Sequence, residues 1–217
     1  MGSVRAIPLT VVAAVGLGIV LGSAAWFSDQ LAWPLQLLVP ANAIGAWLGV
    51  AFVAGATGRT VPLGALRGLL ALAAAVAAYY LLIRLTGEGI RAVGAGHAAT
   101  VWGVVAMITG PVMGAAGATW RHGRGWPRAV SVSLLAAALV AESVGLGAPY
   151  LLAKGLAVDP STIFIAAMAL LGLLLPALLL GRGERLRGYV SLGAIAAAAL
   201  LAIRPTFDLV REFADRF

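Results

Sequence analysis

The chain has no cysteine and very little charge. Charged residues are 11% of its 217 residues and hydrophobic residues are 62%, and of the 15 basic residues only Lys154 is a lysine. The absence of cysteine excludes disulfides, thiolate metal ligands and a cysteine nucleophile. A soluble domain carries about 25% charged residues. The composition therefore excludes an ordinary soluble domain and predicts an all-α, polytopic bundle of transmembrane helices.

Sequence motifs of enzymes are also missing. The chain has no His-Glu-x-x-His metal motif, no nucleotide-binding glycine loop and no serine in a nucleophile turn. His97 and His122 fall at opposite ends of one predicted span, so they cannot ligate the same metal or haem. We therefore expect no enzymatic activity, no catalytic or metal-ligating residue and no cofactor. The net charge of +7 is spread over several loops, which argues against a nucleic-acid partner.

Seven apolar segments approach the length of about 20 residues that a membrane span needs. They are Ile7–Phe27, Leu37–Gly58, Leu69–Leu85, Ala98–Trp120, Ala129–Ala153, Ile163–Gly181 and Tyr189–Ile203. The last is short, so six spans with this segment lying along the membrane is the alternative. We predict one transmembrane domain over residues 1–205. Residues 206–217 would form a short tail that places apolar side chains at helical spacing along the membrane surface.

Arginine is concentrated in alternate loops. The N-terminal segment and the loops after the second, fourth and sixth spans hold most of the arginines, whereas the intervening loops hold Arg84, Arg91 and Lys154. The positive-inside rule therefore predicts a cytoplasmic N-terminus. Three arginines after the last span count against this orientation for seven spans. Together with the Arg-, Ala- and Gly-rich composition, the pattern indicates a multi-pass protein of a bacterial cytoplasmic (inner) membrane.

Glu142 is the most informative polar residue, because it falls near the middle of the predicted span Ala129–Ala153. A carboxylate at bilayer depth is costly unless it is protonated, paired or in contact with water. One interpretation is a proton carrier or ligand-binding group that faces an internal pocket. The other is a structural hydrogen bond to a neighbouring helix, for which Tyr79 and Tyr80 are candidate partners.

The fourth predicted span combines small residues with a proline. Gly103, Gly110, Gly114 and Gly117 lie close to one helical face, which allows a neighbouring helix to approach closely. Pro111 removes a backbone hydrogen bond, so we expect it to kink or interrupt this helix near Glu142. The predicted ligand-binding residues are Glu142, Tyr79, Tyr80, Trp102, Pro111 and Asn42.

The order of four short motifs resembles an actinobacterial family of small polytopic membrane proteins of unknown function. The motifs are Ala78-Tyr79-Tyr80, Trp102-Gly103, Gly110-Pro111-x-x-Gly114-x-x-Gly117 and Ala141-Glu142, and the resemblance extends over Val39–Gly147. It implies no activity. The size, the span number and the small residues of the first span are also similar to the substrate-binding membrane subunits of energy-coupling-factor vitamin transporters. That second similarity implies an architecture only.

Two functional hypotheses follow from these observations. The first is a protein that binds a small solute or takes part in its transport, with Glu142 in an internal polar pocket. The second is a non-catalytic accessory or assembly subunit of a larger membrane complex, with Glu142 as a structural hydrogen bond. The expected partners are the lipid bilayer, a small-molecule ligand and a membrane protein.

Overall fold

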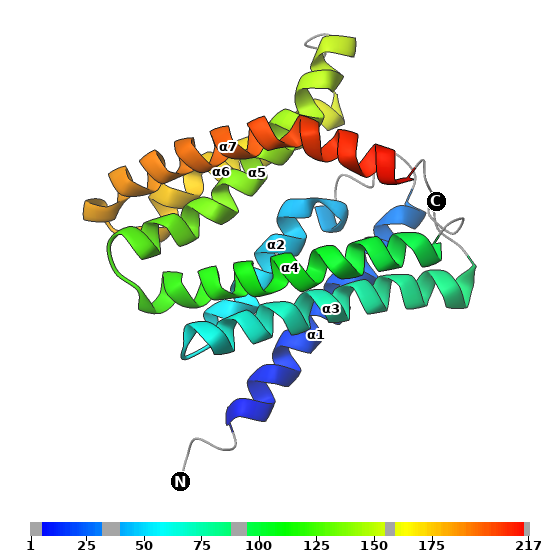
Figure 1. The fold of residues 1–217 in the computed structure, drawn as a ribbon, viewed down its shortest axis with the longest axis horizontal. Coiled ribbons are helices and arrows are strands. Elements are labelled where there is room, and N and C mark those ends of the chain that lie inside the picture. The colour runs from blue at the N-terminus through cyan, green and yellow to red at the C-terminus, as the bar shows by residue number, and fades with distance from the viewer. Residues whose placement is uncertain (1–5, 32–39, 88–94, 155–158, 215–217) are drawn as a thin grey trace.

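The computed structural model describes residues 6–31, 40–87, 95–154 and 159–214, and within these ranges it is entirely helical (Figure 1). The elements are α1 (Ala6–Gln30), the 3-10 turn η2 (Pro40–Asn42), α2 (Ile44–Ala56), α3 (Val61–Thr86), α4 (Ala95–His122), α5 (Trp126–Lys154), α6 (Pro160–Leu179) and α7 (Arg182–Ala214). The predicted all-α class is therefore confirmed.

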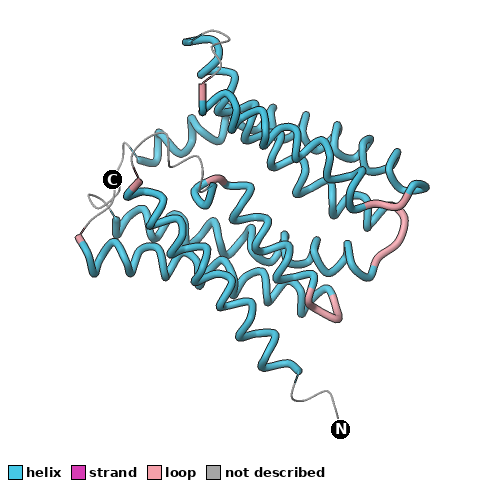
Figure 2. Tube along the Cα trace, turned by 180° about the vertical axis from the view of Figure 1, so that it is seen from behind, coloured by secondary structure: helices cyan, strands magenta, loops and turns pink. Residues whose placement is uncertain are grey.

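The helices form two groups with α2 between them. In the first group α3 packs against both α1 and α4, and in the second α5 packs against both α6 and α7. Figures 1 and 2 show the two groups on either side of α2, which contacts α3, α4 and α5. The groups also meet directly where α4 packs against α5.

Among the described residues, five helices are long and apolar enough to cross a membrane. These spans are Leu9–Gln30, Val61–Thr86, Gly96–His122, Trp126–Gly145 and Pro160–Leu179. The chain is thus a multi-pass membrane protein. The predicted second span, Leu37–Gly58, begins outside the described residues, and within them α2 has only 13 residues. At 1.5 Å per residue α2 is about 20 Å long, less than the roughly 30 Å of the hydrocarbon core.

The observed helix limits correct two expectations about charged residues. The third span begins at Val61 rather than Leu69, because Thr60 caps it and Pro62 lies in its first turn. Arg67, expected in a loop, is consequently inside the helix. The first span continues past Phe27 to Gln30, so Asp29 also lies within a span. Two acidic residues of the described spans, Asp29 and Glu142, thus lie in membrane-spanning segments.

Other helix ends follow the sequence signals closely. Asp159 caps α6, with its Oδ1 accepting a hydrogen bond of 2.9 Å from the Thr162 backbone N–H. In contrast, α4 runs through Pro111 as one helix, so the predicted interruption is not found there. The short helix is α2, which follows the 3-10 turn η2. The last helix, α7, runs without a break from Arg182 to Ala214, through the predicted seventh span and into the predicted tail.

Glycines allow the backbones of neighbouring helices to come into direct contact. A Cβ atom at Gly110 would lie 2.8 Å from Leu69 Cα, and one at Gly114 would lie 2.9 Å from Gly68 Cα. Along α1, Gly18 and Gly22 face the backbone of Ala71 and Ala75 of α3 in the same way. The expected close approach is confirmed for α4, with the exception of Gly103, around which there is open space. Such small-residue contacts are the usual way in which membrane helices pack tightly.

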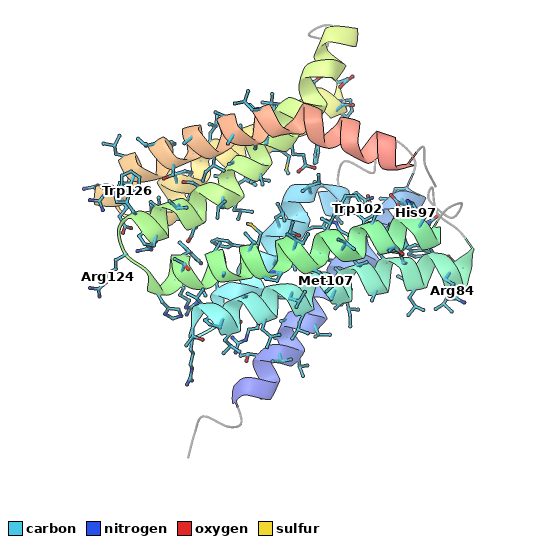
Figure 3. All side chains as sticks on the ribbon, in the orientation of Figure 1. Arg84, His97, Trp102, Met107, Arg124 and Trp126 are labelled. Carbon is cyan, nitrogen blue, oxygen red and sulfur yellow. The ribbon has the colours of Figure 1, made fainter. Side chains whose placement is uncertain are left out.

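The turns between α2 and α3, between α4 and α5, and between α6 and α7 all lie toward one end of the molecule (Figure 1). Figure 3 shows Arg124 and Trp126 at that end, and Arg84 and His97 at the opposite end. We call the first the basic end and the second the opposite end. This separation agrees with the arginine pattern behind the predicted orientation, which remains a prediction.

Candidate functional site

The N-terminus of α2 is held by a side chain from the other group of helices. Ala43, at the N-cap position, has no side-chain acceptor. Instead, Glu142 of α5 accepts two backbone hydrogen bonds: Ile44 N–H donates to Oε1 at 2.7 Å and Gly45 N–H donates to Oε2 at 2.8 Å. Glu142 therefore caps a helix that is almost one hundred residues away in the sequence.

This cap completes the hydrogen bonding at the start of α2. The first four N–H groups of any helix lack an intrahelical partner. Here Ile44 and Gly45 donate to Glu142, and Ala46 donates to the Ala43 carbonyl at 3.0 Å. The regular helix hydrogen bonds begin with Trp47, which donates to the same carbonyl at 3.5 Å. A helix that begins at bilayer depth needs such partners because the hydrocarbon provides none. The structure thus shows Glu142 as a structural hydrogen-bond acceptor, although its side chain is still partly exposed.

A buried arginine lies at the other end of α2. Arg67 of α3 is 2% exposed, and its guanidinium donates to Thr57 Oγ1 at 2.9 Å and to Thr10 Oγ1 at 2.7 Å. Thr57 is the C-cap residue of α2 and itself donates to the Ala54 carbonyl at 2.6 Å. No carboxylate in the described ranges lies within ion-pair distance of Arg67, and its Nε has no hydrogen-bond partner.

The two charges complement the dipole of α2. A helix carries roughly half a positive charge at its N-terminus and half a negative charge at its C-terminus. Glu142 is placed at the positive end and Arg67 lies beside the residue that caps the negative end. In a low-dielectric surrounding, this arrangement lowers the cost of both buried charges. The sequence thus anchors a short membrane helix at both ends with side chains from two other helices.

A second polar group lies beside the α2 N-terminus. Asn42 of η2 donates to Asp29 Oδ1 at 2.6 Å and to the Ala25 carbonyl at 3.3 Å, and the Tyr79 hydroxyl donates to Asp29 Oδ2. Tyr79 is 3% exposed. We call Asp29, Asn42, Tyr79 and Glu142 the polar cluster. Asp29 accepts a hydrogen bond from the Asn42 side chain, and Glu142 accepts one from the Ile44 N–H. These two donors are only two residues apart in the chain.

Aromatic rings surround this polar cluster. Tyr79 meets Tyr80 edge-on, with ring centroids 4.9 Å apart, and Trp47 edge-on at 6.5 Å. Trp47 also donates from Nε1 to the Ala41 carbonyl at 2.7 Å. Of the predicted ligand-binding residues, the structure therefore brings Tyr79, Tyr80, Asn42 and Glu142 to one region. Trp102 and Pro111 of α4 make no hydrogen bond or ring contact with them in the described part of the chain, and Trp102 is 38% exposed.

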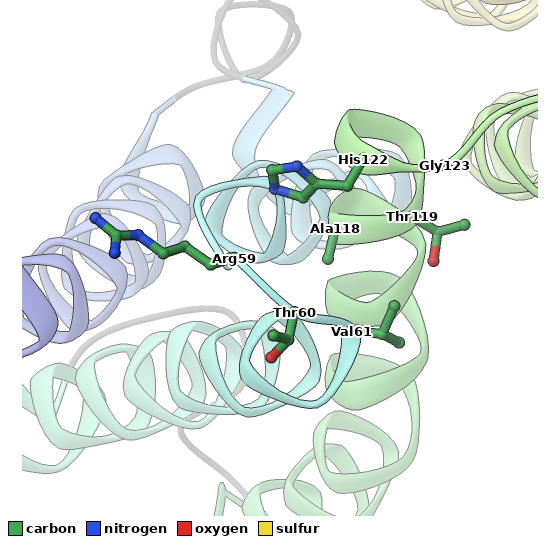
Figure 4. Close-up of a pocket in the computed structure, with 7 residues that line it drawn as sticks. All are labelled: Arg59, Thr60, Val61, Ala118, Thr119, His122 and Gly123. Carbon is green, nitrogen blue, oxygen red and sulfur yellow. The ribbon is translucent and has the colours of Figure 1, made fainter. Parts of the chain in front are cut away.

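A cavity of ≈ 230 Å³ lies elsewhere, at the basic end, between the α2–α3 turn and the end of α4 (Figure 4). Its polar lining residues are Arg59, Thr60, Thr119 and His122. Figure 4 shows the Arg59 side chain directed away from His122 and Thr119. His122 Nε2 is 2.9 Å from the Gly58 carbonyl, a contact that joins the α2–α3 turn to α4. Because the polar groups do not converge, this cavity is a weaker candidate than the polar cluster.

The model of a protein family matches residues 1–209, nearly the whole chain. The chain belongs to DUF6518, a family of unknown function. No curated protein and no solved structure matches this member of DUF6518. The resemblance to a family without an assigned function is thereby confirmed, whereas its restriction to actinobacteria and the likeness to vitamin-transporter subunits remain predictions.

Sequence reasoning missed Arg67 and Asp29 in this DUF6518 protein, because it placed both outside the spans. A signal for Arg67 was present: Thr60 and Pro62 mark a helix start two turns earlier, which places the arginine inside the membrane segment. No sequence signal identified the partners of Glu142, which are the backbone N–H groups of Ile44 and Gly45. A carboxylate that caps a distant helix through backbone N–H groups depends on tertiary structure and not on the residue types at positions 44 and 45.

Proposed function

We propose that this protein binds a small cationic solute, or takes part in its transport, at the polar cluster beside the N-terminus of α2. The observation that supports this proposal is a helix that begins within the bundle, at the junction of its two helix groups, beside two carboxylates. Interrupted helices at the junction of two bundles are a recurrent feature of transporter binding sites. The role is one of binding or transport rather than catalysis.

The chemistry of the polar cluster favours a cation. Asp29 and Glu142 are acceptor-only groups when ionised, and each carboxylate has about four lone-pair positions. Their described hydrogen bonds occupy only some of these positions. No arginine or lysine among the described residues is within ion-pair distance of either carboxylate. A protonated amine or a metal cation would supply the missing positive charge, and the rings of Trp47, Tyr79 and Tyr80 would suit an organic cation.

The cap formed by Glu142 gives such a site a means of coupling to a conformational change. Glu142 belongs to the α5–α7 group, whereas α2 also packs against α3 and α4. A solute that competes for this carboxylate would weaken the hydrogen bonds that join the two groups. Movement of one group against the other would follow, as alternating access requires.

Thermal stability of the purified protein against a panel of inorganic cations and small primary, tertiary and quaternary amines tests the proposal. A cation that binds the native state should raise the melting temperature in a concentration-dependent way. We expect Asp29→Asn to abolish the shift, because it removes a charge while leaving acceptor and donor groups. If no cation or amine shifts the wild-type melting temperature, the proposal is wrong.

Glu184 provides a matched control. Like Glu142, Glu184 accepts a backbone hydrogen bond at the start of a helix: Gly125, just before α5, donates its N–H to Glu184 Oε1 at 2.6 Å. Glu184 differs in that it lies at the basic end. Glu184→Gln should therefore leave the cation-dependent shift unchanged. An equal loss in Glu184→Gln and Asp29→Asn would indicate a non-specific charge effect and would contradict a site at the polar cluster.

An accessory role in a membrane complex is the second proposal, and α6 supports it. Only 11% of the α6 span is buried, against 56% of the α5 span. A photo-crosslinker at Leu171, an exposed residue of α6, tests the idea in native membranes. Reproducible crosslinks to one protein would support an accessory role, and adducts with lipid alone would contradict it.

A further inference from the structure

We propose that the basic end carries a specific binding site for an anionic phospholipid, at the junction of the α4–α5 and α6–α7 turns. This site is separate from the polar cluster and does not depend on the proposed solute. Its headgroup-binding residues would be Arg124, Arg182 and Arg187, together with Trp126. We call these four residues the lipid site.

Exposed arginines dominate the two turns. Arg124, Arg182, Arg185 and Arg187 are all exposed, and the short turns bring the starts of α5 and α7 to the same end of the bundle (Figure 3). The α5 and α7 helices pack against each other. An arginine guanidinium is suited to phosphate because its donors match the spacing of the phosphate oxygens.

Glu184, the acidic residue described in these turns, already has partners within the protein. Glu184 accepts the Gly125 N–H through Oε1, and its Oε2 is 3.6 Å from Arg128 Nη1. Arg128 also donates to the Leu179 carbonyl at 3.4 Å, and Arg185 donates to the Leu180 carbonyl at 3.4 Å. These contacts fix the turns in place. They leave the guanidinium groups of Arg124 and Arg182 without an acidic partner in the described part of the chain.

Trp126 indicates that these arginines lie at the membrane interface. It is 51% exposed, and the Arg187 guanidinium lies over its ring at 5.8 Å from the centroid. Tryptophan is enriched at the level of lipid headgroups. Exposed apolar residues continue from this point along both helices, among them Val130 of α5 and Val190 of α7. Phosphate at the arginines and acyl chains along these faces is the arrangement that a phospholipid requires.

The opposite end supplies a contrast within the same molecule. Arg84 is also exposed, but it is the basic residue of the last turn of α3 and lies far from Arg124 in Figure 3. Asp29 and Asp159 are at that end of their helices. Among the side chains that the structure describes, the exposed arginines are thus gathered where they favour an anionic headgroup at the basic end.

Native mass spectrometry of the purified protein with phosphatidylglycerol, and with phosphatidylcholine of the same acyl chains, tests the proposal. We expect a discrete bound phosphatidylglycerol that resists removal, and no equivalent phosphatidylcholine. Replacement of each arginine of the lipid site by glutamine should weaken binding about fivefold, and Arg124→Gln with Arg187→Gln together about 30-fold. Arg84→Gln should bind as the wild type does. Equal binding of both lipids, or an equal loss in Arg84→Gln, would overturn the proposal.

Two further measurements separate the lipid from other sources of phosphate and from folding defects. Phosphatidylglycerol should raise the melting temperature, whereas inorganic phosphate and glycerophosphoglycerol should not. An equal effect of inorganic phosphate would mean a free-anion site and would overturn the lipid assignment. Brominated phosphatidylglycerol should quench tryptophan fluorescence more than brominated phosphatidylcholine does, and Trp126→Phe should remove this difference. Persistence of the difference in Trp126→Phe would place the lipid elsewhere.

Discussion

At the scale of single residues, Glu142 makes the hydrogen bonds to a neighbouring helix that one of the two sequence interpretations predicted. Two N–H donors approach two different carboxylate oxygens, Ile44 to Oε1 and Gly45 to Oε2. A hydrogen bond to a charged group contributes about 1.5–3 kcal/mol. Glu142 therefore stabilises the start of α2, and any solute that binds Glu142 has to compete with these two hydrogen bonds.

This geometry leads to a graded prediction for Glu142. Glutamine has one carbonyl oxygen, so it can accept only one of the two N–H groups, and its amide nitrogen faces the other donor. Glu142→Gln should lower the free energy of unfolding by about 1–3 kcal/mol, and Glu142→Ala should lower it further, because both donors lose their acceptor. Chemical denaturation in a fixed detergent measures both. A Gln variant as stable as wild type would show that the cap at α2 is not a significant source of stability.

At the scale of the helices, the sequence predicted the glycine packing of α4 but not the side chains that hold the ends of α2. The spacing of Gly110, Gly114 and Gly117 predicted a closely packed face on α4, and the structure confirms it. Pro111 predicted a kink or an interruption in α4, and the helix is not interrupted there. A proline in a membrane helix is tolerated when neighbouring groups satisfy the freed carbonyl. The local sequence could not reveal which side chain caps the short helix α2, because the acceptor comes from α5.

The candidate site was predictable only in part for the same reason. Tyr79, Tyr80, Asn42 and Glu142 were named from the sequence because polar or aromatic side chains stand out in apolar segments. Whether they meet depends on how helices separated by many residues pack. Trp102 shows the limit of this reasoning, since it is conspicuous in the sequence yet exposed in the fold.

Gly114→Leu tests the packing of α4. Its Cβ would lie 2.9 Å from Gly68 Cα, so α3 and α4 would have to separate. Overpacking of this kind costs typically about 1–3 kcal/mol, and more where backbones are in contact. The melting temperature should fall clearly. Gly103→Leu is the matched control, because it places the same residue on the same helix at a position with open space. Equal melting temperatures for the two variants would contradict the observed α3–α4 contact.

At the scale of the whole molecule, two polar contacts of the described residues join the groups of helices at different places. Glu142 joins α5 to α2, and Trp120 Nε1 of α4 donates to the Leu179 carbonyl at the end of α6, at 3.2 Å. The first contact lies beside the polar cluster and the second lies at the basic end. A change at one end that leaves the other intact would therefore tilt one group against the other. This arrangement is consistent with a transport-related role and places the lipid site beside the contact that would stay fixed.

The membrane orientation is the last prediction, and it concerns the molecule as a whole. The natural absence of cysteine makes the test clean, because each introduced thiol is the only one in the chain. Cysteines that replace Arg59, Arg124 and Arg187 at the basic end should be protected from an impermeant thiol reagent in intact cells and should react after the membrane is opened. A cysteine that replaces Arg84, at the opposite end, should react in intact cells. Arginine-rich ends stay cytoplasmic because their translocation is disfavoured. Labelling of position 124 from outside, with position 84 protected, would reverse the orientation and would place the polar cluster toward the cytoplasm.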